Sequence, residues 1–171
     1  ATGMSNGGSM CFRLACELSG KVRAVAAVVA ANSVLLTEQC RPSRPVSVMI
    51  INGTEDPVAP YNGGEVKLFG KARGRIESAD DTAAFWARVN GCTGERMTTD
   101  LPDSDPGDRT RVRRYAYGPG TGGARVVLYR VEGGGHAWPG GISYLSPLLI
   151  GRTSRDMNAC DVIWNFFSEI R

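Results

Sequence analysis

The sequence predicts an α/β fold in which helices pack around a mostly parallel central sheet. Residues 22–31 and 46–51 are apolar and rich in valine, alanine and isoleucine, which is typical of strands buried on both faces. Segments with helical periodicity alternate with such runs, as expected for parallel strands joined by helices. Of the 171 residues, 42% are hydrophobic and 22% charged, so we expect one globular domain over residues 1–171.

The first half of the chain is expected to contain two helices and two strands. Apolar residues at three- and four-residue spacings predict a helix over residues 6–18. A polar connection at 32–44 follows the first strand, and a turn at 52–54 follows the second. Residues 55–75 lack periodicity and are expected to form a loop. A capping box at 78–81 predicts a helix that buries Trp86 and ends near Asn90 and Gly91.

The second half is expected to contain a hairpin and a final helix. Residues 111–117 alternate and residues 125–132 are rich in β-branched residues, with a glycine-rich turn at 118–123 between them. Residues 94–108 are acidic and contain prolines, so we expect a solvated loop, and residues 142–151 are irregular. A second capping-box pattern at 153–156 predicts a helix over residues 155–170, with Trp164 in the core.

The first ten residues contain a candidate nucleophile. Gly3, Ser5 and Gly7 fit the G-x-S-x-G pattern of a nucleophile elbow, in which a strand turns sharply into a helix. The turn holds the serine in a strained conformation with its hydroxyl exposed, and side chains at both flanking glycines would collide with neighbouring elements. The free N–H groups and positive dipole end of the helix point toward Ser5, where an oxyanion would form.

A serine nucleophile needs a base and a carboxylate that orients the base. His136 is the only histidine and follows a predicted strand in a glycine-rich loop, although a lone histidine is more often structural. Asp56 lies just past the strand at 46–51, although an aspartate before proline is also a common turn residue. Ligand-binding loops lie at the carboxyl ends of parallel strands, which is where both residues are expected. The chain order Ser-Asp-His is that of the α/β-hydrolase elbow.

Three blocks of the sequence resemble the catalytic blocks of the polyhydroxybutyrate depolymerase and feruloyl esterase group of the α/β-hydrolase superfamily. They are TGMSNGG at 2–8, NGTEDP at 52–57 and GGGHAWPGG at 133–141, and residues 153–156 and 163–167 are also similar. The resemblance covers essentially the whole chain and implies an α/β-hydrolase fold in a secreted or extracytoplasmic serine esterase. It implies Ser5 as nucleophile, Asp56 as orienting acid and His136 as base, cleaving feruloyl, acetyl-type or hydroxyalkanoate esters through an acyl-serine.

The resemblance also implies how the oxyanion is held. One donor is the N–H of the residue after the nucleophile, Asn6, and the family has the other in a loop that precedes the elbow. Losing one such donor typically lowers the rate by a factor of about 10²–10³. The chain begins four residues before Ser5, so we expect the entering strand, the other amino-terminal strands and that loop to precede Ala1. A missing amino-terminal segment of the same protein is therefore an expected partner.

Other partners and cofactors are not expected. The net charge of +3 is small and scattered, which gives no indication of nucleic-acid binding, and no apolar run is long enough to span a membrane. No metal or other cofactor is expected, because the cysteines lack metal-type spacing and the aspartates at 100–108 do not fit a calcium loop. Trp138, beside the candidate base, is assigned to the substrate site, with a packed loop anchor as the equal alternative.

The five cysteines indicate the redox environment only weakly. Cys40 and Cys92 lie in predicted loops and are the better candidates for a disulfide. Cys11, Cys16 and Cys160 lie on apolar helix faces, where cysteine usually acts as a small buried hydrophobic residue. An odd number leaves at least one cysteine unpaired within the chain.

Two alternatives to a self-sufficient serine esterase stay open. The same three residues would serve a serine peptidase of α/β-hydrolase type, although no charged pocket for a peptide terminus is identified in the sequence. The chain could also be a fragment that needs the missing amino-terminal part of the same protein for activity. The ester substrate itself, small or polymeric, is not defined by the sequence.

Overall fold

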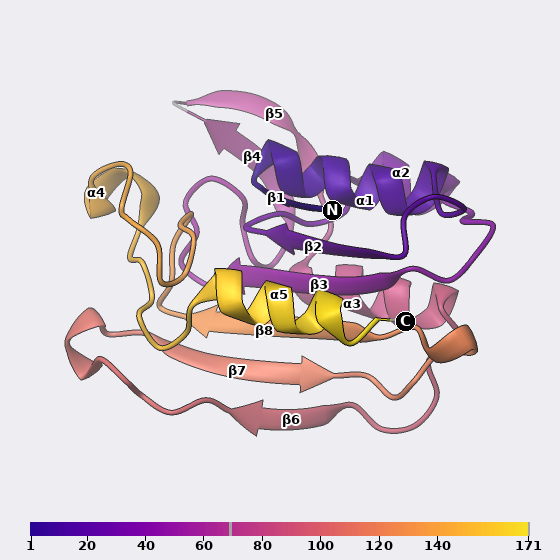
Figure 1. The fold of residues 1–171 in the computed structure, drawn as a ribbon. Helices are drawn as coiled ribbons and strands as arrows, with labels where there is room; N and C mark the ends of the chain where they lie inside the picture. The colour runs from indigo at the N-terminus through magenta and orange to yellow at the C-terminus, as the bar shows by residue number, and fades with distance from the viewer. Residues whose placement is uncertain (69, 171) are drawn as a thin grey trace.

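The computed structural model describes residues 1–68 and 70–170 and has three layers, with helices on both faces of a six-stranded sheet (Figure 1). The strands of this sheet are β1 (Thr2–Met4), β2 (Ala24–Val28), β3 (Ser47–Gly53), β6 (Met97–Asp100), β7 (Arg111–Ala116) and β8 (Val126–Glu132). They follow the order β1-β2-β3-β8-β7-β6. The first four strands of this order are parallel, whereas β7 pairs antiparallel with both β8 and β6. The predicted α/β class is confirmed, with a mixed sheet.

The helices α1 (Asn6–Glu17) and α3 (Ala79–Val89) cover one face of the sheet, and α5 (Ala159–Ser168) covers the other. All seven residues of β3 are buried, as expected for a central strand between two helical layers. Its alternate residues face opposite layers: Ile50 belongs to the cluster with Phe12 and Trp86, and Ile51 to the cluster with Ile163. Within the described residues, no helix has the length and apolar character needed to cross a bilayer.

Helix starts follow the predicted capping patterns in one case and depart from them in another. Ser78 caps α3 by accepting a hydrogen bond from the N–H of Asp81 at 2.9 Å, as predicted. The predicted start of the last helix is wrong, because α5 begins only at Ala159 and is capped by Asn158. The capping-box residue Asp156 instead accepts hydrogen bonds from backbone N–H groups at 104 and 105, so it anchors the acidic loop.

Trp164 lies on the outer face of α5 and is 72% exposed, so its predicted place in the core is wrong. The helix buries Ala159, Ile163 and Phe166 instead. These positions are separated by three and four residues, which places them on one stripe of the helix. Trp86, the other tryptophan predicted in the core, is fully buried.

Several short elements depart from the sequence expectations. α2 (Val34–Gln39) interrupts the predicted polar connection, α4 (Pro147–Ile150) lies in the segment expected to be irregular, and β6 lies in the expected acidic loop. β4 (Gly64–Leu68) and β5 (Lys71–Ile76) form a separate antiparallel hairpin where a loop was expected. Most residues of this hairpin are exposed, so the strands lack the apolar alternation on which a sequence prediction depends.

The strand that enters the turn at Ser5 is present within the chain. We expected this strand to precede Ala1, but residues 2–4 already form β1 and pair in parallel with residues 26–28 of β2. β1 is short and lies at one edge of the sheet (Figure 1). The turn that carries Ser5 is therefore anchored to the sheet by three residues of strand.

One disulfide joins α1 to the segment that follows α2. Cys16 is bonded to Cys40, with Cα atoms 5.5 Å apart. The predicted pairing candidates are therefore half right, because Cys40 is bonded but Cys92 is a free thiol. Cys11 is buried, as expected, whereas Cys160 is exposed.

Loss of this disulfide should lower the free energy of unfolding by about 3 kcal/mol, because the bond removes loop-closure entropy from the unfolded chain. The two cysteines are 24 positions apart in the sequence. The measurement is a urea titration of a variant that carries Cys16→Ser and Cys40→Ser, in which tryptophan fluorescence reports unfolding. Cys160→Ser is the matched control and should change the free energy of unfolding by less than about 0.5 kcal/mol. An unchanged unfolding midpoint in the double variant would contradict this expectation.

Candidate active site

Ser5 occupies the sharp turn between β1 and α1. Its backbone has φ 54° and ψ −117°, a strained combination for a residue with a side chain. A Cβ on Gly3 would lie 2.5 Å from the carbonyl carbon of Gly7, so close backbone approach requires glycine at position 3, as predicted. The predicted collision at Gly7 is wrong, because a Cβ there meets nothing within 4 Å. Gly8 is the constrained residue on that side, since its Cβ would lie 2.7 Å from the Cβ of Ala30.

Asp56 lies in the loop that follows β3, with its side chain 1% exposed. Its Oδ1 accepts hydrogen bonds from the N–H groups of Val58 and Ala59, both at 2.8 Å. Its Oδ2 lies 2.7 Å from Nδ1 of His136. The two backbone donors fix one carboxylate oxygen and leave the other directed at the imidazole.

His136 follows β8 and completes a continuous hydrogen-bonded path from the carboxylate to the serine. Its Nε2 lies 2.9 Å from Oγ of Ser5, and its side chain is 5% exposed. When Nδ1–H donates to Asp56, the lone pair on Nε2 is directed at the Ser5 hydroxyl and can accept its proton. The structure thus brings together the three residues that the sequence analysis predicted, although Ser5 and His136 are 131 positions apart in the chain.

The loops that carry Asp56 and His136 leave the sheet side by side. β3 and β8 are paired in parallel up to Gly53 and Val131, so both loops begin at the same edge. A Cβ on Gly53 would lie 2.3 Å from the carbonyl oxygen of Gly134. The two loops therefore touch backbone to backbone, which only glycine at position 53 allows.

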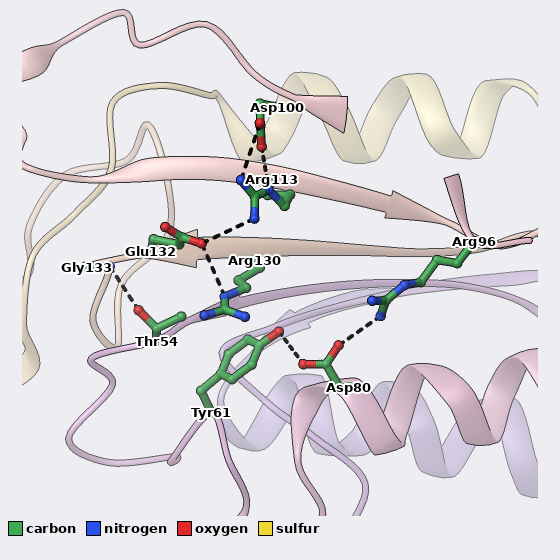
Figure 2. Close-up of polar contacts among 9 residues, drawn as sticks. All are labelled: Thr54, Tyr61, Asp80, Arg96, Asp100, Arg113, Arg130, Glu132 and Gly133. Atoms are coloured by element: carbon green, nitrogen blue, oxygen red, sulfur yellow. Dashed lines mark hydrogen bonds and ion pairs between the residues drawn. The ribbon is translucent and has the colours of Figure 1, made fainter. Parts of the chain in front are cut away.

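Three hydrogen bonds that sequence reasoning missed hold these loops together. The N–H of Gly133 donates to Oγ1 of Thr54 at 2.9 Å (Figure 2). Arg152 donates to Oε2 of Glu55 at 2.7 Å and to the carbonyl oxygen of Gly133 at 3.4 Å. The available signal was positional, because Thr54 and Glu55 are the first polar side chains after a buried strand. Glu55 thus points away from the imidazole toward Arg152.

A second polar network anchors the far end of the loop that carries Asp56. Tyr61 donates its hydroxyl to Oδ2 of Asp80 on α3 at 2.9 Å, and Arg96 donates to Oδ1 of the same carboxylate at 3.1 Å (Figure 2). The guanidinium of Arg130 lies over the Tyr61 ring, 5.2 Å from its centroid. Burial and the hydrogen bond to Asp80 raise the pKa of Tyr61, so its hydroxyl stays a donor. Figure 2 also shows ion pairs across β8, β7 and β6 among Arg130, Glu132, Arg113 and Asp100.

Two cavities include Ser5 in their lining. The first, which we call the hairpin cleft, has a volume of about 890 Å³ and lies between the first residues of α1, α2 and the β4–β5 hairpin. The second, which we call the His136 pocket, has a volume of about 650 Å³ and lies between the hairpin and residues 144–150. Volumes of this size are typical of small-molecule sites. Ser5 therefore lies at the boundary of both cavities.

Asn6 and Trp138 have different relations to these cavities. Asn6 is the first residue of α1 and lines the hairpin cleft beside Ser5. Trp138 is partly buried and packs against the core cluster under α5, and it is not among the described residues that line either cavity. This placement corresponds to the packed loop anchor that was the alternative for Trp138. Tyr144, in contrast, is among the residues that line the His136 pocket.

Tyr144 is a neighbour of the candidate base that the sequence did not indicate. Its hydroxyl donates to the carbonyl oxygen of His136 at 2.9 Å. Burial raises the pKa of the Tyr144 phenol, and the negative charge of Asp56 raises it further. The phenol therefore keeps its proton and the hydrogen bond to the His136 backbone. No pattern in the irregular segment 142–151 distinguishes this tyrosine from the other residues.

The chain is similar to curated proteins that are named as esterases. It is 33% identical over 173 residues to "Putative esterase NocK" of Nocardia uniformis subsp. tsuyamanensis, a match covering 97% of this chain and 49% of that protein. It is 32% identical over 139 residues to "Feruloyl esterase B" of Piromyces equi, covering 80% and 24%. It is 28% identical over 168 residues to "Probable feruloyl esterase C" of Aspergillus terreus, covering 98% and 48%. The chain spans about half the length, or less, of these relatives.

All three of these relatives are named as esterases, and two of them as feruloyl esterases. The chain is related to esterases of the feruloyl esterase type, so the resemblance drawn from its sequence blocks is confirmed for that group. No protein family model matches the chain. No solved structure matches it either.

Proposed function

We propose that the chain is the catalytic part of a serine esterase with an α/β-hydrolase fold, which hydrolyses carboxylic esters through an acyl-serine intermediate. The observation that carries this proposal is the path from Ser5 through His136 to the buried Asp56, with heavy-atom distances of 2.9 and 2.7 Å. The strained backbone of Ser5 and the esterase names of the relatives support it.

The proposed reaction has two halves, acylation of Ser5 and hydrolysis of the acyl-serine, and His136 acts as base and then as acid in each. Ser5 Oγ attacks the ester carbonyl carbon while His136 Nε2 takes the hydroxyl proton, and the N–H of Asn6 at the amino end of α1 donates to the oxyanion. The carbon–oxygen bond to the alcohol then breaks, and the imidazolium returns its proton to the alcohol oxygen. Water, deprotonated by His136, then attacks the acyl-serine, the bond between the acyl carbon and Ser5 Oγ breaks, and the imidazolium returns the proton to Ser5 Oγ as the acid is released. Asp56 holds the imidazole tautomer and stabilises its positive charge.

Feruloyl, acetyl-type and hydroxyalkanoate esters are the proposed substrates, in small or polymeric form. Two curated relatives are named as feruloyl esterases, which supports the first of these classes. A secreted or extracytoplasmic location is also proposed, and the Cys16–Cys40 disulfide supports it because such bonds persist mainly in oxidising compartments. A second oxyanion donor from a further segment of the same protein remains part of the proposal.

Covalent labelling with an alkyl fluorophosphonate tests the proposed nucleophile. The expected result is one adduct per chain, on Ser5, because only a serine activated by a neighbouring base reacts rapidly with this reagent. Trypsin releases residues 1–13 as one peptide that contains both Ser5 and Ser9, so fragment-ion spectra must separate the two. Urea-unfolded protein is the control and should stay unlabelled. Label on Ser9 or elsewhere, or none on the folded protein, would overturn the proposal.

A further inference from the structure

The hairpin cleft contains two positive charges that have no counter-charge. Arg73 and Arg75 of β5 are the charged residues among those described in its lining, which includes no Asp or Glu in the described ranges. Within residues 1–68 and 70–170, neither guanidinium makes an ion pair. Glu65 is the register partner of Arg75, but its carboxylate pairs with Lys67 at 3.3 Å. The cleft is therefore an electropositive cavity next to a serine.

The position of the imidazole determines which cavity binds the acyl part of an ester and which binds the alcohol part. This assignment rests on the proposed function. The group that protonates the leaving alcohol must come within hydrogen-bond distance of its oxygen. His136 lines the His136 pocket but not the hairpin cleft, so the alcohol leaves through the His136 pocket. Asn6, the donor to the carbonyl oxygen, lines the hairpin cleft. The acyl chain therefore extends into the hairpin cleft, toward β5.

We propose that the hairpin cleft binds acyl groups that end in a carboxylate, so that the enzyme prefers half-esters of dicarboxylic acids. The guanidinium groups of Arg73 and Arg75 match the geometry of a carboxylate and form charge-assisted hydrogen bonds with it. The lining of the cleft also includes the apolar residues Val66, Leu68 and Ile76, which suit the methylene chain of such an acid. The chemical step is unchanged: water cleaves the acyl–oxygen bond and releases a dicarboxylic acid and an alcohol.

Two esters of equal size but different charge test this proposal. The anionic substrate is mono-4-nitrophenyl adipate, and the neutral one is 4-nitrophenyl adipamate, in which an amide replaces the free carboxylate. The wild-type chain should hydrolyse the anionic ester with a kcat/KM about tenfold higher, the effect of two partly exposed charge contacts. The preference should shrink between about 0.05 M and 0.5 M salt, because the Debye length falls severalfold.

Variants at the surface of the hairpin assign the preference to the two arginines. A double variant with Arg73→Gln and Arg75→Gln should lose the preference, because its kcat/KM falls about tenfold for the anionic ester and by less for the neutral one. Arg13→Gln is the matched control, since it removes an equivalent exposed charge on the outside of α1, where Arg13 pairs with Glu17. It should keep the preference. Circular dichroism checks that each variant is folded.

The outcomes separate the two proposals. If Ser5 is labelled by the fluorophosphonate but the wild-type chain does not prefer the anionic ester, the charge proposal is overturned and the serine esterase stands. The same holds if the double variant keeps the preference. If Ser5 is not labelled and neither ester is hydrolysed, the serine esterase is overturned and the charge proposal with it.

Discussion

Replacement of Ser5 by alanine is expected to lower kcat for 4-nitrophenyl butyrate by about 10⁶-fold, the loss typical of removing the nucleophile from a serine–histidine–carboxylate arrangement. Ser5 Oγ is the atom that lies 2.9 Å from His136 Nε2, so the variant has no group to form the acyl intermediate. Alanine retains the Cβ and thus the strained backbone at this position. The residual rate should come from the remaining oxyanion donor and from substrate binding.

Ser9→Ala is the matched control for this variant. Ser9 lies one turn further along α1 and lines the same hairpin cleft, but it makes no contact with the imidazole in the described residues. Its replacement should change kcat by less than about twofold, within the range of surface substitutions. Stopped spectrophotometric assays at equal protein concentration compare the three proteins. An equal rate in the Ser5→Ala variant and the wild type would mean that another residue is the nucleophile.

Replacement of Asp56 by asparagine is expected to lower kcat by about 10⁴-fold while leaving the fold intact. The asparagine Oδ1 can still accept from the N–H groups of Val58 and Ala59, which keeps the loop in place. Its amide N–H, however, donates to Nδ1 of His136 where a carboxylate accepts. The imidazole is then held with its proton on Nε2, facing Ser5, and has no lone pair with which to take the serine proton.

The neighbouring carboxylate provides the control for Asp56→Asn. Glu55 is exposed and pairs with Arg152, so Glu55→Gln removes a negative charge at the adjacent position without touching the imidazole. It should retain kcat to within about threefold, the scale of an exposed ion pair. Similar losses in both variants would point to a general loss of charge instead of a specific role for Asp56.

The buried elements of this fold were predictable because burial leaves a periodic pattern in the sequence. β3 contains four consecutive apolar residues at 48–51, and α3 begins at a capping serine. The β4–β5 hairpin was not predictable, since its strands are mostly exposed and carry charges in place of apolar alternation. The Cys16–Cys40 pairing depends on how α1 packs beside the segment after α2, and this tertiary relation has no local sequence pattern.

Around Ser5, the candidate catalytic side chains were predictable, whereas the contacts that support them were not. The three residues Ser5, Asp56 and His136 each follow a strand, so the rule that parallel strands end at one edge was enough to bring them together. The hydrogen-bond partners of Thr54 and Tyr144 were not predictable, because both side chains bond to backbone groups. Backbone acceptors and donors are present at every residue, so the sequence gives no indication of which one is used.

The parallel pairing of β3 with β8 makes the proposed esterase activity a measure of how completely the chain has folded. A slip of β8 by two residues, the smallest that keeps each side chain on its face of the sheet, would move His136 by about 6.6 Å along the strand direction, more than the length of the hydrogen bond it makes with Asp56. A molecule with that slip would keep its helices and most of its strand content. Its circular dichroism spectrum would therefore resemble that of the native protein. It would not hydrolyse the ester, because His136 would no longer lie beside Asp56. Turnover therefore distinguishes molecules with the native register of β8 from molecules with a shifted one.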